Sequence, residues 1–67
     1  MSYISPELRA AVDKANELIA GGMTAIDALE QVSRGMQIGK MALYQRIRLA
    51  GGRLEKQFVL PEELNVA

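Results

Sequence analysis

The sequence contains no cysteine, no histidine and no tryptophan, and these absences exclude several classes of protein. Without cysteine there are no disulfide bonds, and without cysteine or histidine the usual zinc ligand sets cannot be built. Catalysis would have to use carboxylates, lysine, tyrosine or serine, in a chain of 67 residues with little room for a pocket that excludes water. We therefore expect no enzyme, no cofactor and no metal site.

The chain also lacks a long hydrophobic run. No apolar stretch approaches the roughly 18 residues of a membrane span, and the N-terminus has no signal-peptide core. These features predict a cytoplasmic protein without a membrane partner. The hydrophobic content of 49% is too high for a disordered chain. Because a domain this small buries only about 60% of its unfolded surface, we expect a homodimer, which would extend the core.

The net charge is zero, but the charges are segregated along the chain. Residues 1–33 carry two basic and five acidic side chains, and residues 34–56 carry six basic and one acidic. The tail, residues 57–67, adds two glutamates. A basic centre between acidic flanks is typical of a binding face. The alternative is that these cations only keep exposed helices solvated.

Three helices are predicted, at residues 6–20, 24–33 and 40–50. Ser5 and Pro6 mark the first start, and Gly21–Gly22 the first end. Thr24 opens the second helix, which loses its apolar period at residues 33–35. Its expected buried residues are Ala25, Ile26, Ala28, Leu29 and Val32.

The C-terminal arm, residues 53–67, has two interpretations. Residues 56–60 have strand-like composition, and Pro61 restricts such a strand to a sheet edge. Residues 1–4 are a candidate antiparallel partner, within the chain or across a dimer. A short helical turn at residues 61–64 is the other possibility. Met36 and Ile38 are expected inside the connection between the second and third helices.

The third predicted helix has two distinct faces. Helical spacing puts Leu43, Ile47 and Ala50 on one side, where burial is expected. A helix that enters the DNA major groove needs an apolar inner stripe and an outer face that can donate to bases and phosphates. The outer face here carries Met41, Gln45 and Arg48, with Lys40 and Tyr44 along one margin.

Residues 38–51, IGKMALYQRIRLAG, resemble the recognition-helix end of Fis-type helix-turn-helix proteins. Small cysteine-free chains of this kind also resemble proteins encoded by bacteriophages and plasmids. The resemblance implies a compact helical DNA-binding unit used as a dimer. In the family the turn between the two helices has three or four residues, whereas the connection here looks longer. The family's recognition positions map onto Lys40, Met41, Tyr44, Gln45 and Arg48.

We therefore expect one all-α domain over residues 1–67, a small dimeric three-helix helix-turn-helix protein with a short extended or helical C-terminal segment. Its expected function is transcription regulation by binding duplex DNA through the third helix. In this interpretation Arg48 and Gln45 contact base edges, and the remaining cations contact phosphates. The predicted DNA-binding residues are Arg34, Lys40, Met41, Tyr44, Gln45, Arg46 and Arg48.

The alternative function uses the same fold to bind and inhibit a host protein, such as a transcriptional activator. Zero net charge and apolar outer positions suit a protein partner as well as DNA. Met41 and Leu49 are as suitable for a dimer contact as for a ligand contact, and Arg46 has candidate acidic partners in Glu30 and Glu55. The predicted dimer or partner interface comprises Tyr3, Ile4, Leu49, Phe58, Val59 and Leu60.

Overall fold

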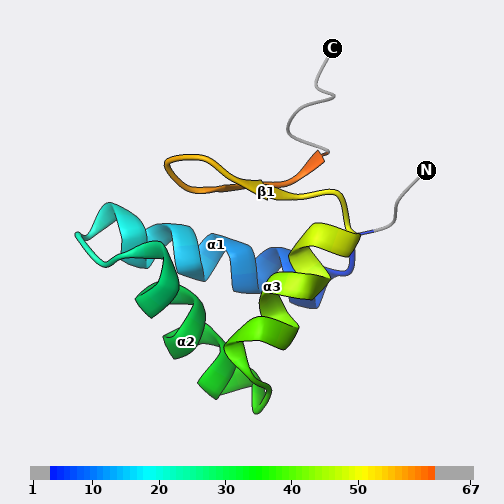
Figure 1. Cartoon of the computed structure of the whole chain (residues 1–67), viewed down its shortest axis with the longest axis horizontal. Helices are drawn as coiled ribbons and strands as arrows, with labels where there is room; N and C mark the ends of the chain where they lie inside the picture. Colours follow the sequence, from blue (N-terminus) through cyan, green and yellow to red (C-terminus); the bar gives the residue numbers. More distant parts are fainter. Residues whose placement is uncertain (1–3, 62–67) are drawn as a thin grey trace.

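The chain is mostly helical, as predicted, with a small hairpin after the third helix. The computed structural model describes residues 4–61. Its elements are α1 (Pro6–Ala20), α2 (Ala25–Met36), α3 (Lys40–Leu49), β1 (Arg53–Leu54) and β2 (Phe58–Val59). In Figure 1, α2 and α3 diverge as a V from the turn that joins them. Helix α1 crosses the open side of this V, and the hairpin lies along α1 (Figure 1).

The first two helices begin at the capping residues that the sequence indicates. The Ser5 hydroxyl oxygen accepts a hydrogen bond of 3.1 Å from the Leu8 backbone N–H. The Thr24 hydroxyl accepts one of 3.2 Å from the Asp27 N–H. Each bond satisfies a donor that the first turn of a helix leaves without a partner. The starts of α1 and α2 are therefore fixed by local chemistry.

Helix α2 continues past its predicted end, through an exposed Gly35 to Met36. It stops because Gln37 takes the left-handed conformation, with φ 60° and ψ 37°. The N–H groups of Gln37 and Ile38 then donate to the carbonyls of Arg34 and Ser33, which is the Schellman pattern of helix termination. The connection to α3 is therefore the three residues 37–39, shorter than the sequence suggested.

The core lies where the three helices meet the hairpin. Ser33 is buried among apolar groups, and its hydroxyl donates to the Glu30 carbonyl. Ile26 was predicted to be buried, but it is exposed because it lies about a quarter turn from the centre of the buried face of α2. The buried apolar residues are Leu8, Ala11, Val12, Ala15, Ala28, Leu29, Val32, Leu43, Ile47, Phe58 and Leu60.

The arm after α3 folds back as an antiparallel hairpin. Arg53 is paired with Val59 and Leu54 with Phe58. The strand therefore pairs with β1, and its proposed pairing with residues 1–4, within the chain or across a dimer, stays a prediction. Of those, residues 1–3 lie outside the described part of the chain, Tyr3 among them, and Ile4 packs partly against the core. The alternative helical turn at residues 61–64 lies almost wholly outside it.

The burial of two hairpin residues corrects part of the interface predicted from the sequence. Phe58 and Leu60 are fully buried within the single chain, so they have no exposed surface to offer to a second copy. Sequence reasoning assigned them to an interface because it could not pair the arm with its own helices. Val59 stays half-buried.

The side chain of Asn16 attaches the hairpin to α1. Its Nδ2 donates to the Phe58 carbonyl at 2.9 Å, and its Oδ1 accepts from the Phe58 N–H at 2.8 Å. The Asn16 amide thus forms a hydrogen bond with both the N–H and the carbonyl group of Phe58, which is 42 positions away in the sequence. Because buried backbone groups need partners, this contact fixes where Phe58 enters the core.

We expect replacement of Asn16 by alanine to lower the free energy of unfolding by about 2 kcal/mol, because both Phe58 backbone groups lose their partner. Urea denaturation followed by circular dichroism measures this change. Asp13→Ala is the control, because Asp13 is exposed on the same helix and its loss should cost less than about 0.5 kcal/mol. Equal stability of the two variants would contradict the assigned role of Asn16.

Candidate functional site

Helix α3 is held in one orientation at both ends. Its start follows the left-handed turn at Gln37, and Leu43 and Ile47 are buried on its inner face. After the helix the chain turns through Gly51, with φ 89°, to a buried Gly52. A Cβ atom on Gly52 would lie 2.7 Å from the Ile47 Cγ2 atom, so only glycine permits this approach. These contacts fix the orientation of α3 and therefore the direction in which its outer face points.

The exposed face of α3 carries the residues that helical spacing assigned to it. Met41 is 64% exposed, Gln45 and Arg48 are exposed, and Tyr44 is half-buried. Leu49 is 85% exposed, a large fraction for a leucine. The face therefore combines polar, cationic and apolar side chains.

The cations near α3 fall into two groups. Glu30 contacts both Arg34, through a hydrogen-bonded ion pair, and Lys40, whose Nζ lies 3.6 Å from its Oε1. Arg46 and Arg48, in contrast, form no ion pair with any residue between 4 and 61. The alternative pairing of Arg46 with Glu30 or Glu55 does not form. Among the described residues, the cations of α3 without an ion-pair partner are thus Arg46 and Arg48.

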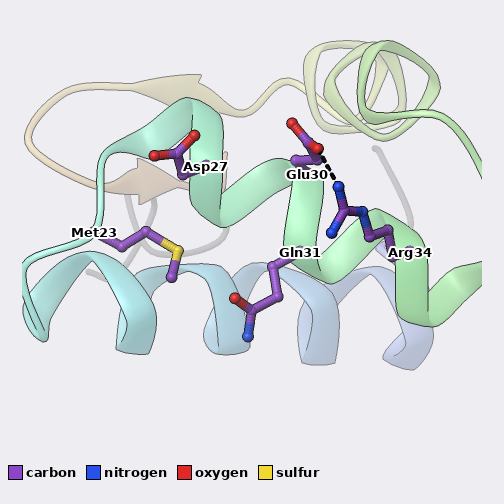
Figure 2. Close-up of a pocket in the computed structure, with 5 residues that line it drawn as sticks. All are labelled: Met23, Asp27, Glu30, Gln31 and Arg34. Carbon is purple, nitrogen blue, oxygen red and sulfur yellow. Dashed lines mark hydrogen bonds and ion pairs between the residues drawn. The ribbon is translucent and has the colours of Figure 1, made fainter.

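A polar hollow of about 280 Å³ runs along α2. Figure 2 shows Asp27 and Glu30 at one edge of the helix, with Arg34 turned back toward Glu30. Met23 and Gln31 lie on the side nearer α1 (Figure 2). Within residues 4–61 no three acidic side chains are grouped as a metal site would require. The ion pair between Arg34 and Glu30 lies at the wall of this hollow.

A second hollow, the apolar groove, lies between α2, α3 and β1 and encloses about 320 Å³. Three large apolar side chains at its wall are exposed: Ile26 at 61%, Met41 at 64% and Leu54 at 42%. Sequence reasoning assigned Met41 and Tyr44 to a DNA-reading face and missed Ile26 and Leu54. The groove is defined by Ala25, Ile26, Leu29, Lys40, Met41, Tyr44 and Leu54.

The composition of the groove could be only partly foreseen. Ile26 sits at the edge of the apolar stripe of α2, which is a signal in the sequence. Leu54 reaches the groove only through the fold of the hairpin, and no local pattern indicates that.

Comparisons with protein-family models, with curated proteins and with solved structures find no match to this chain. No helix between residues 4 and 61 is long and apolar enough to cross a membrane.

Replacement of a glutamine by glycine should have opposite effects on stability in the turn before α3 and inside α2. Gln37→Gly should raise the free energy of unfolding by about 1 kcal/mol, because glycine adopts positive φ without steric cost. Gln31→Gly should lower it by a similar amount, about 1 kcal/mol, because Gln31 lies inside α2. Urea denaturation of both variants tests this. A loss of stability in Gln37→Gly would contradict the left-handed turn.

Proposed function

We propose that this chain is a helix-turn-helix protein that binds duplex DNA through the exposed face of α3. The observation that carries this proposal is a helix without carboxylates whose Arg46 and Arg48 have no ion-pair partner within residues 4–61. Helix-turn-helix units join two helices by a turn of three or four residues that often contains glycine. The turn at residues 37–39 has this length and contains Gly39.

The residues of this face divide by the contacts they suit. Arg48 and Gln45 are exposed, and their side chains match the donor and acceptor patterns of guanine and adenine in the major groove. Arg46 is suited to a phosphate contact. Lys40 and Arg34 share the negative charge of Glu30, which opposes the approach of a phosphate. We therefore assign Arg34 and Lys40 a smaller part in binding than Arg46 and Arg48.

A dimer belongs to the same proposal. Two α3 helices related by a two-fold axis would enter successive major grooves if they lie about 34 Å apart. Leu49 and Val59 retain exposed surface, and residue 59 pairs with Arg53, four positions after Leu49. We assign the self-association surface to this end of the molecule. A cytoplasmic regulator of transcription is the role that fits such a dimer.

The second candidate function is the binding and inhibition of a host protein, such as a transcriptional activator. The apolar groove favours it, because the exposed Ile26 and Leu54 at its wall add nothing to the recognition of a polar, anionic duplex.

DNA binding is tested by fluorescence anisotropy of a labelled mixed-sequence duplex, at low and near-physiological salt. The Arg46→Ala/Arg48→Ala double variant should bind at least about tenfold more weakly, with a salt dependence reduced by about two units of slope. The Arg34→Ala/Lys40→Ala double variant removes the same charge and should lose less. No binding by the unaltered chain at low salt, or equal losses in both variants, would refute the proposal.

The dimer is tested by sedimentation equilibrium of the whole chain. Leu49→Ser should raise the dimer dissociation constant at least about tenfold, because a large exposed side chain leaves the interface. Ala42→Ser is the control, since Ala42 is exposed on the same helix. A monomeric unaltered chain, or unchanged association of Leu49→Ser, would show that this surface is not an interface.

A further inference from the structure

We infer that the apolar groove docks an amphipathic helix of another protein, one whose apolar stripe is flanked by carboxylates. Because Met41 and Tyr44 belong both to the groove and to the proposed DNA-reading face, such a helix also competes with DNA for α3. The competition rests on the proposed function. The docking itself rests on the groove.

The shape and chemistry of the groove match those of a helix-binding site. Three of the four large hydrophobic residues exposed between residues 4 and 61 surround this one hollow, namely Ile26, Met41 and Leu54. Exposed apolar side chains gathered around a cleft mark interaction sites. An amphipathic helix fills such a groove with apolar side chains spaced three, four and seven residues apart.

The cations beside the apolar groove indicate which kind of helix it would bind. Lys40 lines the groove, and Arg48 lies on the same face of α3, seven residues after Met41 and four after Tyr44. Arg48 has no ion-pair partner between residues 4 and 61. The cations at positions 40 and 48 are separated by about 12 Å along the helix axis. An occupant with carboxylates beside its apolar stripe would complement Arg48, and Lys40 to a smaller extent because Glu30 already pairs with it.

The same charges disfavour a contact in which α3 of a second copy occupies the groove. Helix α3 carries Lys40, Arg46 and Arg48 and no acidic residue, so packing α3 against its own copy would place like charges together. Like charges across an interface oppose association. The complementary surface is therefore acidic, unlike α3 of a second copy; an acidic helix of a different protein is the occupant we infer.

The test is a selection from a displayed library of helical peptides that vary in apolar pattern and charge, against the immobilised full chain. Peptides rich in Asp and Glu with an apolar stripe should be enriched. They should bind Ile26→Glu at least about tenfold more weakly, and Gln57→Glu as well as the unaltered chain. Gln57 is exposed and does not line the groove, so it controls for added charge. Circular dichroism verifies that both variants fold.

Three outcomes would overturn the docking: no enrichment, enrichment of basic or uncharged peptides, or equal binding to Ile26→Glu. Loss of self-association in Ile26→Glu, measured by sedimentation equilibrium, would instead identify a second copy as the occupant and overturn it too. Release of labelled DNA by an enriched peptide supports competition, and simultaneous binding refutes it. DNA binding without enriched peptides overturns only the docking, whereas enriched peptides on a chain that binds no DNA overturn only the DNA function.

Discussion

The paired hydrogen bonds between Asn16 and the backbone of Phe58 are the constraint on which the rest of the structure depends. They place the hairpin on α1 and bring Phe58 and Leu60 into full burial. Each of these side chains contributes about 2 kcal/mol when it leaves water, a large share of the stability of so small a domain. At the end of α3, Gly52 lies close to Ile47 and to the buried Leu60.

The surface features follow from this internal arrangement. Because the hairpin closes the core, Leu54 of β1 forms part of the wall of a groove whose other sides are α2 and α3. Because Leu43 and Ile47 face inward, Arg46 and Arg48 remain exposed on the outside of α3. The apolar groove and the cationic face therefore adjoin on one helix.

Local interactions could be predicted from the sequence, and long-range ones could not. The caps at Ser5 and Thr24 and the buried pair Leu43 and Ile47 follow from residue type and helical period. The end of α2 was missed because glycine is the usual residue at a left-handed cap, and here Gln37 occupies it.

The hairpin was missed for a different reason. Its attachment depends on a side-chain contact across 42 positions, and no periodic pattern records such a contact. Only part of the groove could be predicted, for the same reason. Its wall combines residues of α2 and α3 with one residue of β1.

The fixed orientation of α3 has a thermodynamic consequence. The left-handed turn at Gln37 and the close approach of Gly52 to Ile47 define the path of the helix before any partner arrives. Binding through α3 would therefore require no folding of this segment, and the entropic cost would come from lost translational and rotational freedom, from side chains and from the partner. The heat capacity change on binding would then report the apolar area covered in the groove without a contribution from folding of α3.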